Sequence, residues 1–189
     1  FIMLIAKAKR KENIVEYLLY MYQIEDIIRS LGFDINAIDQ RIIASFDQPI
    51  EVKVQIKEWY AGLIKELKAN SLERSGHLPF LKELVIELQE LHTSLLTNYQ
   101  DKEYQKLYNQ AREELIMLVK RSGGAKLDNE IDVALNGMYG LLILKLKQEE
   151  ISNDTLQAMQ KVSKMLARLA YQFKQKEEGG LSTTPHINN

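Results

Sequence analysis

The chain has 189 residues, of which 46% are hydrophobic and 27% are charged, and its formal net charge is −1. This balance argues against a disordered chain and excludes binding to nucleic acid through overall charge. The chain has no cysteine, which excludes disulfides, thiolate zinc sites and cysteine nucleophiles.

The first strong helical pattern covers residues 11–29, where apolar and aromatic side chains occupy nearly every side. A helix of this kind belongs inside a core, so it is predicted to be the most buried element. It should begin near Asn13, with Glu16 completing a capping box, and should end at Gly32. The run before it, FIMLIAKAKRK, is apolar and then basic, and its basic residues Lys7, Lys9, Arg10 and Lys11 are expected to form a solvated lead-in.

Further helices are predicted downstream from apolar residues at three- and four-residue spacing. The short connections between them predict antiparallel neighbours, so the fold is expected to be all-α, a compact up-and-down antiparallel bundle of about six to seven helices. Residues 1–177 should form a single helical-bundle domain and residues 178–189 a disordered tail. The downstream helices are expected to begin near Asn36, Pro49, Pro79, Asp101, Asp128, and Ser152 or Asp154.

The last predicted helix combines an apolar stripe with a basic face that has no acidic residue between residues 155 and 176. This face is expected to complement Glu83, Glu87 and Glu90 of the helix that begins near Pro79, and not to bind a membrane. No window reaches the about 18 uncharged apolar residues of a spanning helix. The expected inward stripes of the last two helices are Ile131, Leu135, Met138, Leu142 and Leu146, and Leu156, Met159, Val162, Leu166, Leu169 and Phe173.

The strings AKAKRKENI and QIEDIIR, both within residues 3–35, resemble the N-terminal signature of an uncharacterised bacterial family described only as a domain of unknown function. The resemblance implies an all-helical fold of similar length. It supplies no activity, cofactor or catalytic residue. It is also compatible with a natural start at Met3, with Phe1 and Ile2 as an alternative start or an artificial extension.

Motifs for the common chemistries of helical bundles are missing. A di-iron centre needs Glu-x-x-His, but none of His77, His92 and His186 has a glutamate three residues before it. The segment SGGAK, residues 122–126, lacks the spacing of a phosphate loop, and no Gly-x-Ser-x-Gly elbow occurs. Carboxylates from different helices could still converge on magnesium. No catalytic residue, metal ligand or cofactor is therefore predicted, and enzymatic activity is left open with a non-enzymatic role favoured.

These observations favour a non-enzymatic helical interaction or scaffold module in the cytoplasm. Its expected partner is a second copy of the chain, in a homodimer, or an unknown protein, with no nucleic acid and no membrane. The alternative is a small-molecule-binding or catalytic bundle with a polar-aromatic pocket beside the helix of residues 11–29. Buried tyrosine tips need polar partners, and the residues expected to line this pocket are Glu16, Tyr17, Tyr20, Gln23 and Asp26.

Overall fold

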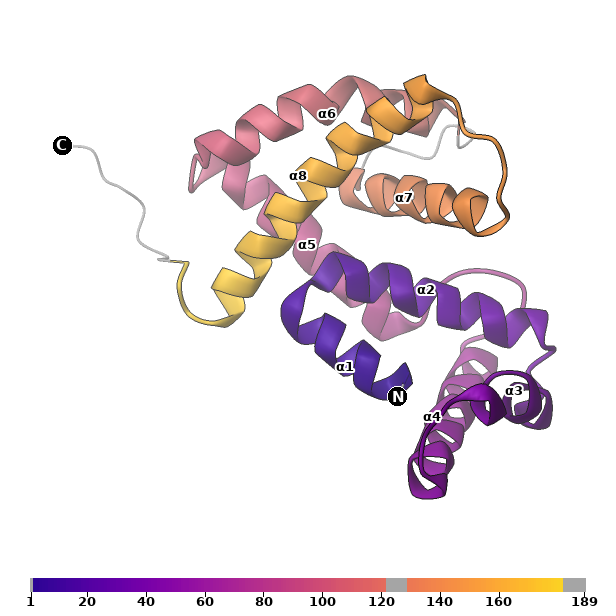
Figure 1. The fold of residues 1–189 in the computed structure, drawn as a ribbon. Coiled ribbons are helices and arrows are strands. Elements are labelled where there is room, and N and C mark those ends of the chain that lie inside the picture. The colour runs from indigo at the N-terminus through magenta and orange to yellow at the C-terminus, as the bar shows by residue number, and fades with distance from the viewer. Residues whose placement is uncertain (1, 122–128, 182–189) are drawn as a thin grey trace. The chain divides into compact units, whose positions relative to one another are not determined.

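A computed structural model describes residues 2–121 and 129–181 (Figure 1). Eight α-helices, one 3₁₀ helix and no strand occur over these residues, so the predicted all-α class is confirmed. The chain divides into two compact units, residues 1–82 and 83–189, and the single domain predicted for residues 1–177 stays a prediction. The helices are α1 (Ile2–Glu12), α2 (Ile14–Ser30), α3 (Ile35–Arg41), η1 (Ile43–Ser45), α4 (Ile50–Ala69), α5 (Pro79–Thr97), α6 (Lys102–Arg121), α7 (Glu130–Leu146) and α8 (Asn153–Glu177).

The structure adds a helix that the sequence analysis did not predict, because residues 2–12 form α1, which packs against α2 and α4. Of the predicted solvated residues, Lys7 and Lys11 are exposed and Lys9 and Arg10 are half-buried. Three of the basic residues of α1, Lys9, Arg10 and Lys11, occupy the last turn, where cations interact favourably with the helix dipole. Ala6 is buried, and Lys9 Nζ lies 2.8 Å from Glu16 Oε2. The apolar half of α1 therefore provides a packing face, while its basic half provides an ion pair with the next helix.

The predicted start and end of α2 are confirmed, but Glu16 does not complete the predicted capping box, because the Asn13 N–H donates to the carbonyl of Lys9 and Glu16 pairs with the Lys9 side chain. The Asn13 side chain accepts hydrogen bonds from the backbone N–H groups of Val15 and Glu16. At the other end Gly32 has φ 64°, and the next backbone N–H donates to the carbonyl of Ile28, as in a Schellman motif. Eight of the 17 residues of α2 are buried, and Leu18 is completely inaccessible. This helix is the central element of the first unit.

In the rest of the first unit, α3, η1 and α4 pack on one another, and α4 also contacts α1. The Asp34 side chain caps α3 by accepting from the N–H of Asn36, and α4 follows Pro49. In the short helical segment Ile38 and Ile43 are completely buried, whereas Ile42 and Phe46 are half-buried. The connection after α4 is tied to α2, because Arg29 donates from Nε to the carbonyl of Leu72 and from a terminal nitrogen to the carbonyl of Gly76.

In the second unit α6, α7 and α8 pack on one another (Figure 1). The predicted stripe of α8 is buried from Met159 to Phe173, but Leu156 is partly exposed. The predicted stripe of α7 is wrong at its end, where Leu146 is 56% exposed and the buried set stops at Leu141. The buried residues of α7 are Ile131, Ala134, Leu135 and Leu141.

The basic face of α8 finds its partners on and before α6, not on α5 as predicted. Lys161 Nζ lies 2.6 Å from Glu114 Oε1, and Arg168 lies 3.0 Å from Asp101 Oδ2. Neighbouring helices in this unit therefore carry complementary charge, as expected, with a different helix as the acidic partner.

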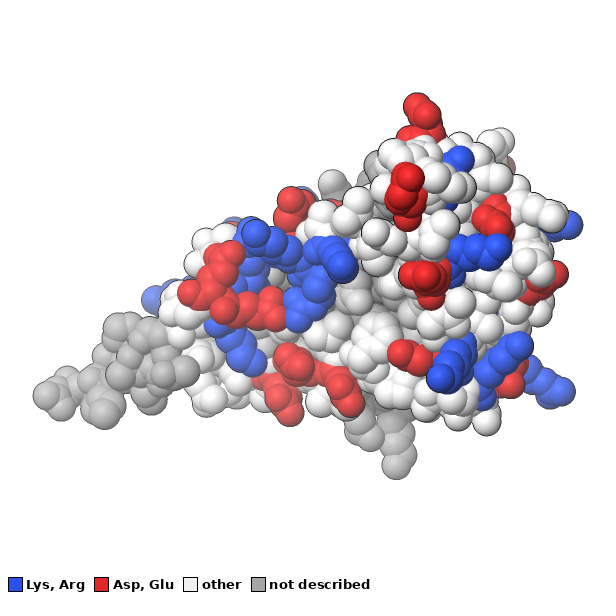
Figure 2. All heavy atoms as spheres, turned by 90° about the horizontal axis from the view of Figure 1, so that it is seen from below, with Lys and Arg blue, Asp and Glu red and all other residues white. Residues whose placement is uncertain are grey.

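Charge is mixed over the face drawn in Figure 2, where basic and acidic side chains of the described residues are interspersed. None of the helices in the described ranges is long and apolar enough to cross a bilayer. The segment SGGAK and the predicted disordered tail from residue 182 onward lie outside the described residues.

Candidate functional site

An aromatic pocket lies in the first unit, beside α2, and has a volume of about 480 Å³. Tyr17 and Met21, one helical turn apart, face it from α2, and Trp59 faces it from α4. Burial raises the pKa of the Tyr17 hydroxyl, and the charge of Arg10 partly offsets this effect. The other lining residues are Met3, Ala6, Lys7, Arg10, Leu63 and Phe80.

Of the five residues predicted to line a pocket beside this helix, Tyr17 lies in the aromatic pocket and the other four do not. Glu16 is exposed and bound to Lys9, and Asp26 is exposed and paired with an arginine one turn later. Gln23 is half-buried, as is Tyr20, and burial raises the pKa of Tyr20 to about 12. Tyr17 therefore stands apart from the others, with partners that come from α1 and α4.

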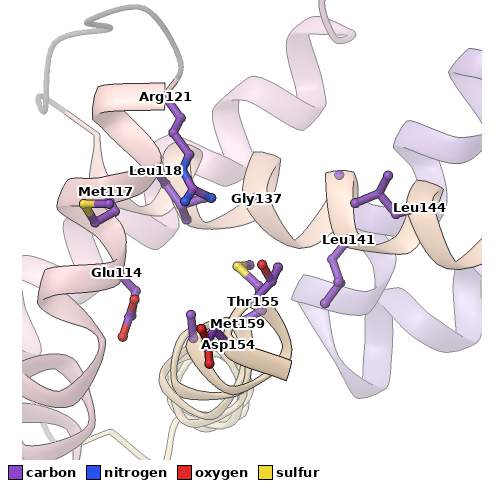
Figure 3. Close-up of a pocket in the computed structure, with 12 residues that line it drawn as sticks. Glu114, Met117, Leu118, Arg121, Gly137, Leu141, Leu144, Asp154, Thr155 and Met159 are labelled. Carbon is purple, nitrogen blue, oxygen red and sulfur yellow. The ribbon is translucent and has the colours of Figure 1, made fainter. Parts of the chain in front are cut away.

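A second hollow lies in the second unit, where α6, α7 and α8 meet, and its volume is about 390 Å³ (Figure 3). We call it the α6–α8 groove. Arg121 extends over it from the end of α6, and Asp154 comes from the first turn of α8 (Figure 3). Neither side chain is ion-paired within the described part of the chain. The lining residues are Glu114, Met117, Leu118, Arg121, Gly137, Gly140, Leu141, Leu144, Asp154, Thr155, Ala158 and Met159.

Two glycines of α7 shape this groove in different ways. A Cβ atom on Gly137 would lie 2.8 Å from Cδ1 of Leu118, so this glycine permits close packing of α7 on α6. A Cβ atom on Gly140 would meet no heavy atom within 4 Å. Gly140 therefore leaves the groove open without being needed for packing.

A buried carboxylate, Glu25, forms a polar cluster in the first unit that is absent from the predicted site. Its side chain is 0% exposed; Oε2 lies 2.6 Å from His77 Nδ1, and Oε1 accepts from the N–H of Leu78 at 2.8 Å. The imidazole stacks on Tyr22 with ring centroids 3.6 Å apart. The apolar pattern of α2 signalled that Glu25 needed a partner, but 52 residues separate it from His77.

His92 forms the corresponding cluster in the second unit, as a buried histidine with partners on both ring nitrogens. The hydroxyl of Tyr104 lies 2.7 Å from Nδ1, and Glu130 Oε2 lies 3.3 Å from Nε2. The His92 ring holds the pKa of Glu130 below its usual range, with help from the Tyr108 hydroxyl, although burial acts in the opposite direction. These contacts join α5, α6 and α7, so the cluster is structural.

The described residues contain no group of three or more His, Cys, Asp or Glu side chains placed to hold a metal ion. Of the two histidines in the described ranges, His77 is the more accessible, with 25% of its side chain exposed against 4% for His92. The candidate sites are therefore the two hollows. The aromatic pocket is lined by aromatic and basic side chains, and the α6–α8 groove is mainly apolar, with one basic and two acidic residues on its lining.

These features define an all-α helical protein with an apolar groove in one unit and an aromatic pocket in the other. The family model described as "Domain of unknown function (DUF4924)" matches residues 3–180, and the chain belongs to this family. No curated protein and no solved structure matches the chain significantly. Membership of a family of unknown function, predicted from the N-terminal strings, is thus confirmed.

Proposed function

We propose that the protein is a non-enzymatic helical interaction module that binds a second copy of its own chain through the α6–α8 groove. A cytoplasmic location, expected from the sequence, is part of this proposal. The observation that carries it is the composition of α7, which is apolar on nearly every side although only four of its 17 residues are buried. A helix that is apolar on nearly every side is normally buried on all sides. The solvent-exposed side of α7 therefore favours burial against another protein.

Exposed apolar side chains concentrate at the open side. Leu144 on α7 is 41% exposed and Met117 on α6 is 47% exposed, and both line the groove. Leu156 at the start of α8 lines a smaller neighbouring depression, which shares Leu141 and Met159 with the groove. Burying such side chains against another protein surface contributes about 25 cal/mol per Å². The groove therefore has the apolar centre that a stable interface needs.

The charges on the groove favour a second copy as the occupant. The lining holds a cation, Arg121, and an anion, Asp154, on different helices. In a twofold interface the same surface of both copies is used, so a contact between two different residues occurs twice, once in each direction. A surface that carries both a positive and a negative charge can therefore be complementary to a second copy of itself. We expect Arg121 of one chain to approach Asp154 of the other, twice per dimer.

Substituting Gly140→Leu separates association from folding. A Cβ atom at this position meets no heavy atom within 4 Å, and because Gly140 lines the groove we expect the rest of the leucine side chain to occupy it. Replacing a helical glycine should raise stability by about 1 kcal/mol. We therefore expect a protein that unfolds at higher temperature and yet has a larger dimer dissociation constant, so that in sedimentation velocity it is already monomeric at concentrations where the wild type is dimeric.

A matched pair of charge insertions provides the control. Leu144→Asp should weaken association at least about tenfold, which corresponds to 1.4 kcal/mol. Ile86→Asp places the same charge on α5, at a position that is 53% exposed and outside the groove, and should leave association unchanged. A wild-type chain that stays monomeric at high micromolar concentration, or equal weakening by both variants, would contradict the proposal.

A further inference from the structure

The aromatic pocket of the first unit is built differently from the α6–α8 groove. Met3, Ala6, Lys7 and Arg10 of α1 follow one another at spacings of three, one and three residues, which places them on one helical face. The pocket therefore exists only because residues 2–12 are helical.

Aromatic rings and basic groups are combined on its walls. Tyr17, Trp59 and Phe80 come from three different helices and provide flat apolar surfaces. Lys7 and Arg10 are the charged residues on the lining, which includes no carboxylate. Lys7 is exposed and forms no ion pair within the described residues.

We propose that this pocket binds a small amphipathic anion, a molecule with an apolar body and a single carboxylate or similar head group. The apolar body lies against the rings and methionines, whose flexible thioethers adapt to irregular ligands. The head group lies at Lys7 and Arg10. A volume of about 480 Å³ is within the usual range for small-molecule sites. All lining residues belong to residues 1–82, so the proposal is independent of self-association.

The chain carries its own reporter for this site, because Trp59 is the single tryptophan in the sequence and lies on the pocket wall. Dodecanoate and dodecanol serve as probes that share an apolar chain and differ in charge. Titration of dodecanoate below its micellar concentration should change Trp59 emission saturably, with one molecule bound per chain.

Two double variants separate the pocket from general basicity. Lys7→Gln with Arg10→Gln should weaken dodecanoate binding about tenfold, because charge-assisted hydrogen bonds to the head group are lost. Dodecanol binding should not change. Lys11→Gln with Lys65→Gln removes two positive charges from the same unit, at exposed positions outside the pocket, and should affect neither probe.

The proposal is overturned if dodecanoate gives no saturable signal, if both probes weaken equally, or if the control pair weakens dodecanoate as much. Circular dichroism melts of all variants should coincide with the wild type, which excludes unfolding as the cause. Sedimentation with anionic vesicles completes the test. Co-sedimentation that disappears in the Lys7 and Arg10 variant would assign these residues to a membrane surface and overturn the small-molecule site.

Discussion

The buried carboxylate of Glu25 offers the most demanding test of how the first unit holds together. It is completely inaccessible. One of its oxygens is within hydrogen-bonding distance of His77 Nδ1, and the other accepts a hydrogen bond from the N–H of Leu78, just before α5. Removing one partner of a buried pair typically costs about 3 to 5 kcal/mol, since the remaining group is left uncompensated. We expect Glu25→Ala to lose stability in this range, towards the lower end because the His77 ring can reach water.

Two companion variants distinguish polar satisfaction from packing. Glu25→Gln keeps the shape and an acceptor for the Leu78 N–H, so its cost should be on the order of 1 kcal/mol. Glu25→Leu combined with His77→Phe replaces the pair by apolar groups and should recover only part of the loss, because the buried N–H of Leu78 still lacks its acceptor. Phe at residue 77 would keep a ring stacked on Tyr22.

The assay is urea unfolding at neutral pH, followed through Trp59, which lies in the same unit. Far-ultraviolet circular dichroism provides the second signal for the whole chain. If Glu25→Ala unfolds within about 1 kcal/mol of the wild type, the pair is not important for stability and the reasoning is wrong.

Three further predictions concern the packing and the charges of the helices. Leu18→Ala should lower the free energy of unfolding by about 2 to 5 kcal/mol, measured by urea titration, because the side chain is completely buried; a negligible loss would refute the central position of α2. Burial raises the pKa of Asp101, but the Tyr104 N–H, Arg168 and Gln172 outweigh it and hold the pKa below its usual value. The ionised carboxylate therefore stabilises the fold above the unfolded pKa of about 3.9, and this stabilisation is lost as the pH falls through the lower folded pKa. Asp101→Asn should accordingly reduce the loss of unfolding free energy at acidic pH, measured by urea titration over a range of pH. An unchanged pH dependence would refute this. Gly140→Ala should stabilise the chain by about 1 kcal/mol in thermal melts, whereas Gly137→Ala should gain less or lose stability through contact with Leu118; equal gains would contradict the packing difference.

Much of the fold was predictable because its signals are local. Asn13 and Gly32 mark the ends of α2 through caps that involve only neighbouring residues. The helix α1 was missed because its apolar half is short and its basic half reads as solvent-exposed, while Ala6 and Lys9 find their partners only in the folded chain.

The candidate site was less predictable because its residues meet across helices. Glu16, Tyr20 and Gln23 lie on one face of α2. Tyr17 lies on another face, together with Met21. The predicted set was grouped by closeness in sequence and therefore combined residues from different faces of the helix. The partners of Tyr17 include Trp59 and Phe80, which are far away along the chain. No spacing rule connects these residues, and the same is true of Glu25 and His77.

The most direct test of self-association through the α6–α8 groove is a charge exchange between Arg121 and Asp154. In a homodimer of Arg121→Asp two acidic residues would meet at each expected contact, and in a homodimer of Asp154→Arg two basic residues would meet there. Each variant alone should therefore be monomeric in sedimentation velocity. In an equimolar mixture both contacts of a twofold interface again join opposite charges, and a heterodimer should form. Formation of that heterodimer from two monomeric variants is the predicted result. Single variants that associate like the wild type, or a mixture that stays monomeric, would contradict the proposed interface.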